Sequence, residues 1–405
     1  MRTLAALAPE VRQYLLVTGN YWAFTLTDGA LRMLVVLHFH ALGYSPLQIA
    51  ALFLFYELFG VITNLVGGYL GARLGLNRTM NIGLGMQVGA LLMLTVPAVW
   101  LSVPWVMAAQ ALSGVAKDLN KMSAKSTLKL LVSDGQQGTL YRWVAKLTGS
   151  KNALKGVGFF LGGALLASLG FRGALLAMAS ALGLIWIGSL ILLKRDLGKA
   201  KTKPRFRDLL SKSRAINLLS AARLFLFGAR DVWFVVALPV YLSSAFGWDF
   251  WEVGGFLAAW VIGYGLVQSC APYITGKKRG HVPDGRGAFL WALALAGLPM
   301  AIALGLGTGL SQQMVLLGGL AVFGGLFAVN SSLHSYLIVS YAKEDGVSLD
   351  VGFYYMSNAM GRLIGTLLSG WVYQAQGLEA CLWISSGFVL LAAVISMALP
   401  RHAGH

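Results

Sequence analysis

Twelve apolar runs of helical length follow one another along this chain, separated by short polar connections. A helix needs about 20 apolar residues to cross the hydrocarbon core of a bilayer. The runs fall at 14–39, 47–70, 80–100, 104–124, 143–169, 174–193, 215–245, 251–275, 287–306, 313–339, 350–373 and 380–399. Only 12% of the residues are charged, against about 25% in ordinary soluble domains. The sequence therefore predicts an all-α polytopic membrane protein with twelve transmembrane helices.

The longest polar stretch, 194–214, lies at the midpoint of the chain and carries nine basic residues. It divides the sequence into an N-terminal half, 1–193, and a C-terminal half, 215–405, each with six predicted helices. Connections on the side of the N-terminus hold 22 of the 32 Lys and Arg residues, and connections on the other side hold only Arg172. Because basic loops stay in the cytoplasm, we expect both termini and the linker to be cytoplasmic. The net charge of +17 thus indicates topology, not nucleic-acid binding.

The two halves contain weak internal repeats. Leu42-Gly43-Tyr44-Ser45 matches Phe246-Gly247-Trp248-Asp249, and Lys155, Gly158 and Gly163 match Arg362, Gly365 and Gly370. Two six-helix halves related by an axis along the membrane normal are typical of the major facilitator fold. The matches therefore predict that fold, with two pseudo-symmetric halves.

The segment 68–78 resembles the signature that major facilitators carry between helices 2 and 3. Its glycines and basic residues are in place, from Gly68 to Arg78. Ala72 stands where the family has an Asp that is thought to hold an interhelical charge contact. The resemblance supports the fold and leaves open how gating works at this position.

Nine basic residues fall within the predicted helices, and four acidic residues accompany them. The bases are Arg32, Lys117, Lys121, Lys146, Lys151, Lys155, Arg223, Arg230 and Arg362, and the acids are Asp28, Glu57, Asp118 and Asp231. A charge at the centre of a bilayer costs about 2.5–3.5 kcal/mol on insertion scales, so such residues face a cavity or each other. If each acid pairs with one base, five cations remain, and this surplus predicts an anion-binding cavity.

Helical spacing predicts some of the pairs. Asp28 and Arg32 are four residues apart, and Asp118 and Lys121 are three apart, so each pair can meet on one helix face. Arg230 and Asp231 are neighbours, so their side chains diverge by about 100° and we expect their partners on other helices.

The predicted substrate site consists of cations on the helices that line the cavity of a facilitator. The resemblance to that fold implies that helices 1, 4, 7 and 10 line the cavity, with helices 5 and 11 beside it. Five cations on these helices are predicted to bind the substrate: Arg32, Lys117, Lys155, Arg230 and Arg362. Repeat-related cations can clamp one anion, and Arg binds phosphate-like groups bidentately. Each side chain could instead reach the membrane interface or pair between helices.

Eight further residues are predicted to support the site or to couple transport: Asp28, Glu57, Asp118, Lys121, Asp231, Asn20, Asn330 and His334. The alternative for the last three is an interhelical hydrogen bond. Proton antiport through Glu57, Asp28 or Asp231, anion exchange and uniport all remain open. No nucleophile–base pair, metal-ligand spacing or phosphate loop is recognisable, so we expect a transporter without metal or cofactor, not an enzyme.

Four segments resemble a narrower group, the organoarsenical efflux permeases of bacterial arsenic-resistance operons. They are residues 14–33, 114–126, 149–163 and 222–242. The resemblance implies a protein of the bacterial inner (plasma) membrane that confers arsenate resistance by exporting 1-arseno-3-phosphoglycerate. A companion glyceraldehyde-3-phosphate dehydrogenase would make this ester in the cytoplasm.

Two observations bear on the substrate. The ester carries an arsenate and a phosphate group, which agrees with a surplus of cations. A carrier for arsenite, a soft thiophile, would offer thiols, and the only cysteines are Cys270 and Cys381. The alternative that the residues leave open is an exporter or exchanger of an ordinary organic phosphate such as glycerol phosphate.

Overall fold

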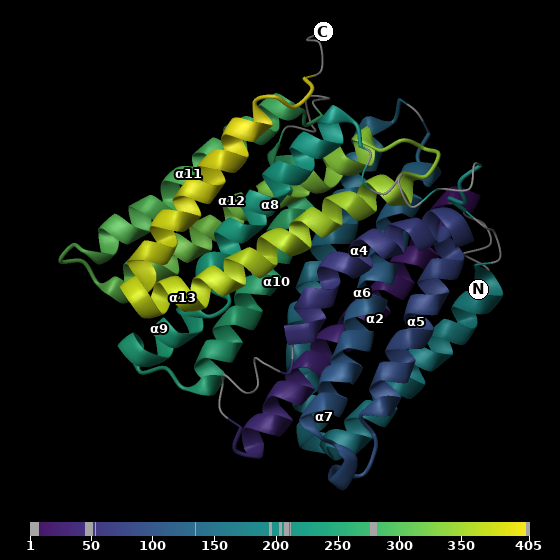
Figure 1. Cartoon of the computed structure of the whole chain (residues 1–405), viewed down its shortest axis with the longest axis horizontal. Helices are drawn as coiled ribbons and strands as arrows, with labels where there is room; N and C mark the ends of the chain where they lie inside the picture. The colour runs from purple at the N-terminus through teal and green to yellow at the C-terminus, as the bar shows by residue number, and fades with distance from the viewer. Residues whose placement is uncertain are drawn as a thin grey trace. The chain divides into compact units, whose positions relative to one another are not determined.

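The computed structural model describes residues 8–44, 52, 54–133, 135–193, 197–201, 205, 210, 212–275 and 282–401, except for the side chains of residues 54, 55, 57 and 250. The regular structure in these residues is helical throughout (Figure 1). The elements are α2 (Pro9–Ala41), α4 (Leu54–Leu74), α5 (Leu76–Met93), η1 (Ala98–Trp100), α6 (Val103–Leu131), α7 (Gln137–Leu192), α8 (Arg214–Phe234), α9 (Ala237–Phe246), α10 (Phe250–Ile274), α11 (Gly285–Leu306), α12 (Gln312–Tyr341) and α13 (Val347–Ser396).

Two of these elements contain a pair of helices joined at a glycine. The chain turns at Gly170 in α7, where φ is 68°, and at Gly377 in α13, where φ is 80°. Glycine adopts positive φ without the steric cost that a Cβ imposes, and Figure 1 shows α13 doubling back on itself. With these pairs counted separately, and α8 and α9 as one interrupted span, the described residues form the twelve predicted helices.

Several predicted boundaries differ from the structure, two of them by seven residues. The third helix was expected over 80–100 but ends at Met93, because Pro97 disfavours helical backbone in the residue before it. The fourth helix was expected to end at residue 124, yet α6 continues to Leu131. Lys125 and Lys129 therefore belong to a helix and not to a loop, and the side chain of Lys125 is buried.

The described chain forms two compact units. Unit 1 comprises Met1–Leu140, Ser150–Ser211 and Ala342–Met356, and unit 2 comprises Tyr141–Gly149, Lys212–Tyr341 and Ser357–His405. Residues 141–149 of α7 thus belong to unit 2, and residues 347–356 of α13 belong to unit 1. The predicted division into halves joined by the 194–214 linker stays a prediction.

Glycines allow repeat-related helices to approach closely within each unit. In unit 1, a Cβ on Gly158 of α7 would lie 2.7 Å from the carbonyl oxygen of Leu26 in α2. In unit 2, a Cβ on Gly365 of α13 would lie 2.7 Å from the carbonyl oxygen of Gly228 in α8. Positions that match in the sequence therefore make the same kind of backbone contact in separate units.

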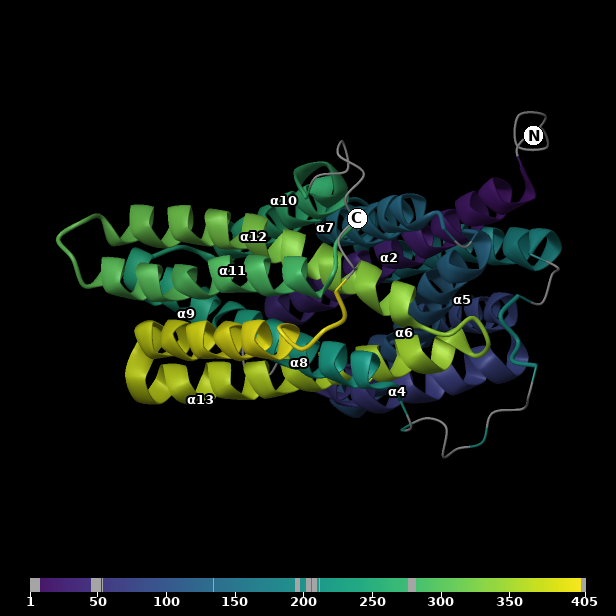
Figure 2. The same ribbon diagram turned by 90° about the horizontal axis from the view of Figure 1, so that it is seen from above.

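Other helices of each unit pack along their length. In unit 1, α6 lies against both α4 and α5, and in unit 2, α11 and α12 run side by side in both Figure 1 and Figure 2. An aromatic core that includes Trp233, Phe323 and Phe327 fills unit 2.

Ala72, at the departure from the facilitator signature, lies buried at the end of α4. Its carbonyl oxygen accepts a hydrogen bond from the amide of Ala200 at 2.8 Å, and the amide of Leu76 donates to the carbonyl of Leu197 at 2.7 Å. The amide of Lys201 donates to Asp345 Oδ1 at 2.9 Å. The described part of the central linker is therefore tied to the α4–α5 junction by backbone hydrogen bonds.

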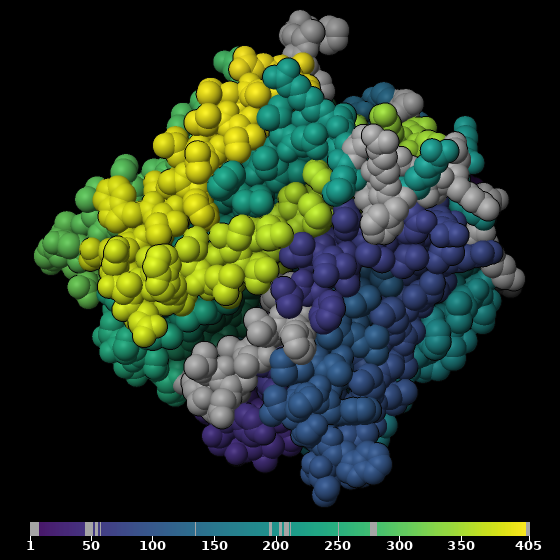
Figure 3. Space-filling view, in the orientation of Figure 1, coloured from purple at the N-terminus to yellow at the C-terminus, as the bar shows by residue number. Residues whose placement is uncertain are grey.

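Large apolar side chains cover the outer surfaces. Figure 3 shows α13, drawn from yellow-green to yellow, on the surface of the molecule. The exposed side chains of this helix include Leu367, Trp371 and Leu390. Six helices of the described chain, with α7 and α13 each counted once, are long and apolar enough to cross a membrane. These exposed apolar surfaces suit contact with lipid.

Replacing Gly158 or Gly365 by valine should destabilise the protein, because the added side chain would press on the backbone of the neighbouring helix. Overpacking of this kind costs about 1–3 kcal/mol, and thermal unfolding of detergent-purified protein measures it. Gly163→Ala and Gly370→Ala are matched controls: a Cβ at Gly163 meets nothing nearer than 3.6 Å, and one at Gly370 meets nothing within 4 Å. Equal melting temperatures for all four variants would contradict the contact.

Candidate functional site

A buried tyrosine organises the charges of α2, α4 and α6 in unit 1. The Tyr56 hydroxyl donates hydrogen bonds to both carboxylate oxygens of Asp28, at 2.9 and 3.2 Å. The Arg32 guanidinium carbon lies 4.6 Å from the Tyr56 ring centroid, and Lys117 Nζ lies 3.7 Å from it. One ring therefore contacts two of the predicted substrate-binding cations.

The hydrogen bonds from Tyr56 to Asp28 strengthen the contacts of its ring with the two cations. Cation–π attraction arises because the face of an aromatic ring is negative, and each contact contributes about 0.5–2 kcal/mol. Asp28 polarises the phenolic O–H and makes the ring richer in electrons, so it strengthens the hold on Arg32 and Lys117. The ring positions the two cations without neutralising their charge.

A second carboxylate in unit 1 pairs as its spacing predicted. Lys121 Nζ donates to Asp118 Oδ1 at 2.7 Å, and the Thr63 hydroxyl donates to Asp118 Oδ2 at 2.7 Å. Lys121 also lies 4.6 Å from the ring of Tyr355, which Lys125 approaches to 5.0 Å. Lys125 and Tyr355 were not predicted as site residues.

Two other predicted residues of unit 1 have less definite surroundings. Lys155 lies on α7 where that helix meets α2, and a Cβ on Gly29 would lie 2.6 Å from the Lys155 carbonyl oxygen. The side chain of Glu57, which was predicted to support the site or carry a proton, lies outside the described part of the structure.

In unit 2, Asp231 binds two arginines. Arg230 contacts Asp231 Oδ1 through Nε at 2.6 Å and Nη2 at 2.5 Å, and Arg362 Nε donates to Oδ2 at 3.0 Å. The expectation that Arg230 finds its partner on another helix is therefore wrong. Its long side chain curves back around the helix to the adjacent residue, while Arg362 reaches Asp231 from α13.

A third arginine, Arg223, lies about two turns before Arg230 on α8. Arg223 Nε donates to Asn358 Oδ1 at 2.8 Å, and Nη1 contacts the Ser331 hydroxyl at 3.3 Å. The ring of Phe227 lies 3.8 Å from the guanidinium carbon of Arg223 and 5.0 Å from that of Arg230. As at Tyr56, a single ring contacts two cations.

Carboxylates and cations differ in their access to solvent. The side chain of Asp231 is 0% exposed, whereas those of Arg230 and Arg362 are 15% and 26% exposed. In unit 1, Asp118 is 1% exposed and its partner Lys121 is 12% exposed. These two carboxylates are thus fully buried, and their cationic partners are partly exposed.

Of the uncharged residues predicted to support the site, two form hydrogen bonds between helices and one is buried in the core. Asn20 Nδ2 donates to the Ser189 hydroxyl at 2.8 Å, which links α2 to α7. Asn330 Nδ2 donates to the carbonyl oxygen of Trp291 at 2.9 Å, which links α12 to α11. His334 is fully buried, and neither ring nitrogen has a hydrogen-bond partner among the described residues.

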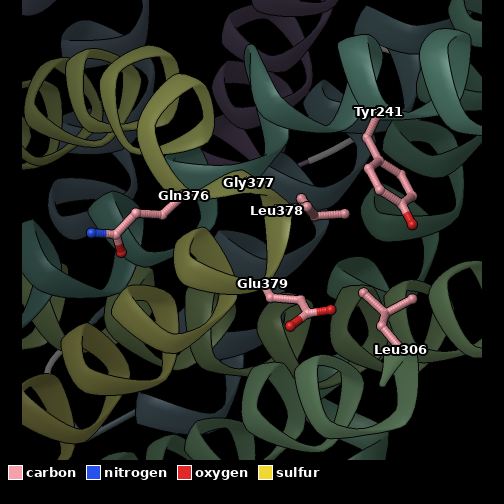
Figure 4. A pocket seen from close by; sticks show the side chains of 6 residues that line it. All are labelled: Tyr241, Leu306, Gln376, Gly377, Leu378 and Glu379. Carbon is pink, nitrogen blue, oxygen red and sulfur yellow. The ribbon is translucent and has the colours of Figure 1, made fainter. Parts of the chain in front are cut away.

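A surface cavity of about 310 Å³ lies elsewhere in unit 2. Figure 4 shows its lining: Tyr241, Leu306, Gln376, Gly377, Leu378 and Glu379. Its charged lining residue is acidic, so it does not suit an anion. Among the described residues, no group of three or more His, Cys, Asp or Glu side chains could hold a metal ion.

The sequence from residue 15 to residue 347 matches the Major Facilitator Superfamily. This match spans well over half of the chain. The chain belongs to the Major Facilitator Superfamily. It is therefore a multi-pass membrane transporter of a small molecule, with the all-helical major facilitator fold that its sequence predicted.

Solved structures of three facilitator-like proteins share this fold. The human organic anion transporter MFSD10 (TETRAN) is 18% identical, with a TM-score of 0.76 over 96% of this chain and 100% of that one. The E. coli fucose:proton symporter FucP is 12% identical, with a TM-score of 0.74 over 96% and 99%. A bacterial homologue of the iron transporter ferroportin in an outward-facing state is 15% identical, with a TM-score of 0.72 over 95% and 98%. At these identities the likeness shows the fold alone, and no curated protein matches the chain.

Changing Tyr56 should weaken the binding of inorganic phosphate, the simplest probe of the predicted anion site. Tyr56→Leu removes the ring that positions Arg32 and Lys117, and loss of these contacts should lower affinity by about two- to tenfold. Tyr56→Phe keeps the ring but removes the hydrogen bonds to Asp28 that make it richer in electrons, so a smaller loss is expected. Titration calorimetry on purified protein measures both, with Tyr273→Phe, an exposed tyrosine, as the control. An unchanged phosphate affinity in Tyr56→Leu would rule out the positioning role.

Proposed function

We propose that this transporter exports a polyanionic organoarsenical, 1-arseno-3-phosphoglycerate, from the bacterial cytoplasm by alternating access, and so confers resistance to arsenate. The class of substrate is supported by the surplus of cations in both units. The identity of the substrate is supported by the resemblance of four segments to organoarsenical efflux permeases. The similar fold of a human organic anion transporter is compatible with an anionic cargo.

The observation that carries the proposal is the arrangement around Asp231. Two guanidinium groups share one carboxylate, so the trio keeps a net positive charge. The carboxylate of Asp231 is buried and both arginines are partly exposed. In this proposal the two guanidinium groups, and not the carboxylate, contact the ligand. Arg recognises phosphate and similar tetrahedral oxyanions through paired N–H donors.

Unit 1 supplies the second group of cations for the proposed cargo. Arg32 and Lys117 both contact the Tyr56 ring, which carries no charge of its own. The ester has an oxyanion at each end, and the cations of either group suit such an oxyanion. Lys155 in unit 1 and its repeat partner Arg362 in unit 2 belong to the proposed substrate-binding cations.

The direction of transport is supported by the resemblance to efflux permeases. In this proposal the protein lies in the inner membrane with both termini and the basic linker in the cytoplasm, and it receives its substrate from a cytoplasmic enzyme. A companion glyceraldehyde-3-phosphate dehydrogenase would form the ester when arsenate replaces phosphate. The alternative cargo is an ordinary organic phosphate such as glycerol phosphate, which the same cations could bind.

Everted membrane vesicles distinguish the two cargoes. Glyceraldehyde-3-phosphate dehydrogenase, its triose phosphate substrate, oxidised nicotinamide cofactor and labelled arsenate generate the arseno ester on the outside of such vesicles. The proposal expects arsenic uptake only when all four are present together with the transporter. Uptake of labelled glycerol 3-phosphate without arsenic uptake would instead support the alternative.

Removing either arginine that binds Asp231 should abolish most of the transport. Arg230→Ala and Arg362→Ala each lose charge-assisted hydrogen bonds worth about 1.5–3 kcal/mol, so uptake per unit substrate should fall by about 10- to 100-fold. Arg172→Ala, at an exposed arginine, is the matched control and should transport normally. Arsenate resistance of cells that express each variant at wild-type level gives a second readout. Full resistance in both arginine variants would refute this role of the pair.

A further inference from the structure

Two buried polar side chains of unit 2 have no hydrogen-bond partner among the described residues. They are Ser220 on α8, through its hydroxyl, and His334 on α12, through both ring nitrogens. Ser220 is 1% exposed and His334 is 0% exposed, so bulk solvent does not reach them. Most buried polar groups in proteins are hydrogen-bonded, either to protein atoms or to ordered water. These two side chains therefore indicate a small polar ligand inside unit 2.

Two contacts show how α8 and α12 face each other. The rings of Phe227 on α8 and Phe327 on α12 have centroids 5.1 Å apart. Arg223 Nη1 on α8 donates to the Ser331 hydroxyl on α12 at 3.3 Å. Four residues back along α8 thus correspond to four residues forward along α12. The two helices are therefore antiparallel, and these contacts fix their register.

This register places Ser220 opposite His334. Ser220 lies seven residues before Phe227, and His334 lies seven residues after Phe327. Seven residues make about two helical turns, so each polar residue shares a helix face with its phenylalanine. The hydroxyl and the imidazole therefore face the same interface at the same level, yet neither is a hydrogen-bond partner of the other.

The ring of His334 limits what the ligand can be. Arg223 lies within electrostatic range of this ring. A cationic imidazole would add a second positive charge beside the guanidinium in a buried interface, which is unfavourable. The neutral ring has one N–H donor and one acceptor nitrogen. The ligand must therefore both donate and accept hydrogen bonds, as water does.

A third unpaired atom lies one turn before His334 on α12. Asn330 Nδ2 donates to the carbonyl oxygens of Trp291 and Leu326 at 2.9 and 3.0 Å, which fixes the orientation of the amide. Asn330 Oδ1 has no partner among the described residues. Residues four apart lie on one face of a helix, so this oxygen and the His334 ring are neighbours.

We propose that His334 holds ordered water inside unit 2. One water molecule is shared with Ser220 across the α8–α12 interface, and a second is shared with Asn330 along α12. Each ring nitrogen then has a partner, and so do the Ser220 hydroxyl and the Asn330 oxygen. Buried waters bridge polar groups that would otherwise be unpaired. Serine and histidine together have less side-chain volume than two phenylalanines, which suits a site that also holds water.

This water gives His334 a role that does not involve the cargo. The residue was predicted to support the site or to couple transport, and the inference assigns it the supporting role. Its water joins α8 to α12 beside Arg223. The inference therefore does not rest on the proposed function, and either can fail without the other.

The unfolding equilibrium of the full-length protein in detergent–SDS micelles tests the shared water. Removing a hydroxyl that has no partner leaves stability unchanged or raises it. Removing one that binds water breaks a hydrogen bond, so Ser220→Ala should lower the folded-to-unfolded ratio by about two- to twentyfold. His334→Leu removes the ring that holds the water. In that background Ser220→Ala should have no further effect, because the shared water is already lost.

Ser396→Ala is the matched control for this double-mutant cycle. Ser396 is also a buried serine of unit 2, but its hydroxyl donates to the carbonyl oxygen of Ala392 on its own helix at 2.7 Å. Its effect should be the same with and without His334→Leu. A Ser220→Ala variant as stable as the wild type, or one that loses equal stability in both backgrounds, would overturn the inference.

A structure of the full-length protein at a resolution that shows ordered water gives a measurement that needs no His334 variant. We expect a peak about 2.5–3.2 Å from both Ser220 Oγ and a ring nitrogen of His334, and its loss in Ser220→Ala. The lack of a peak there, or a direct hydrogen bond between the two side chains, would contradict the shared water. A peak that is present in chloride buffer and lost in sulfate buffer would show a bound anion, and the inference would again be wrong.

Discussion

The structure depends on holding more positive than negative charge among apolar helices. Nine basic and four acidic residues fall within the predicted helices, and aromatic rings add contacts to several of the described cations. Tyr56, Phe227 and Tyr355 each contact two cations. A ring attracts a cation through its quadrupole and does not cancel the charge.

The carboxylates and their cationic partners differ in how far they are buried. Asp231 and Asp118 are fully buried, and their cationic partners are partly exposed. Close helix contacts at Gly158 and Gly365 bring α7 onto α2 and α13 onto α8. The same glycine contacts set the positions of Lys155 and Arg362, each three residues before its glycine. Repeat-related positions thus place a cation beside an acid-bearing helix in each unit.

The sequence predicted the order and type of the helices. It predicted one ion pair correctly and was wrong about another. Asp118 and Lys121 pair as their spacing indicated, because both lie on one face of one helix. Arg230 binds the adjacent Asp231, which a rule based on helix faces does not anticipate, since a long guanidinium side chain can curve around the helix. Tyr56 and Tyr355 were not predicted as site residues, because the search was for charged residues within the helices. Tyrosines in predicted helices are usually packing or interface residues. Lys125 was counted as a loop residue because the charges on α6 lower its hydropathy and hide where the helix ends.

The sequence by itself determined the membrane class, the number of helices and the sign of the surplus charge, because hydropathy and charge are local properties that can be read residue by residue. Only the tertiary structure decided which ring holds which cation and which carboxylate lies behind it. These contacts join residues on different helices, and they depend on the rotation and close approach of those helices. Backbone contacts at glycines set that approach, and no local pattern in the sequence encodes the rotation.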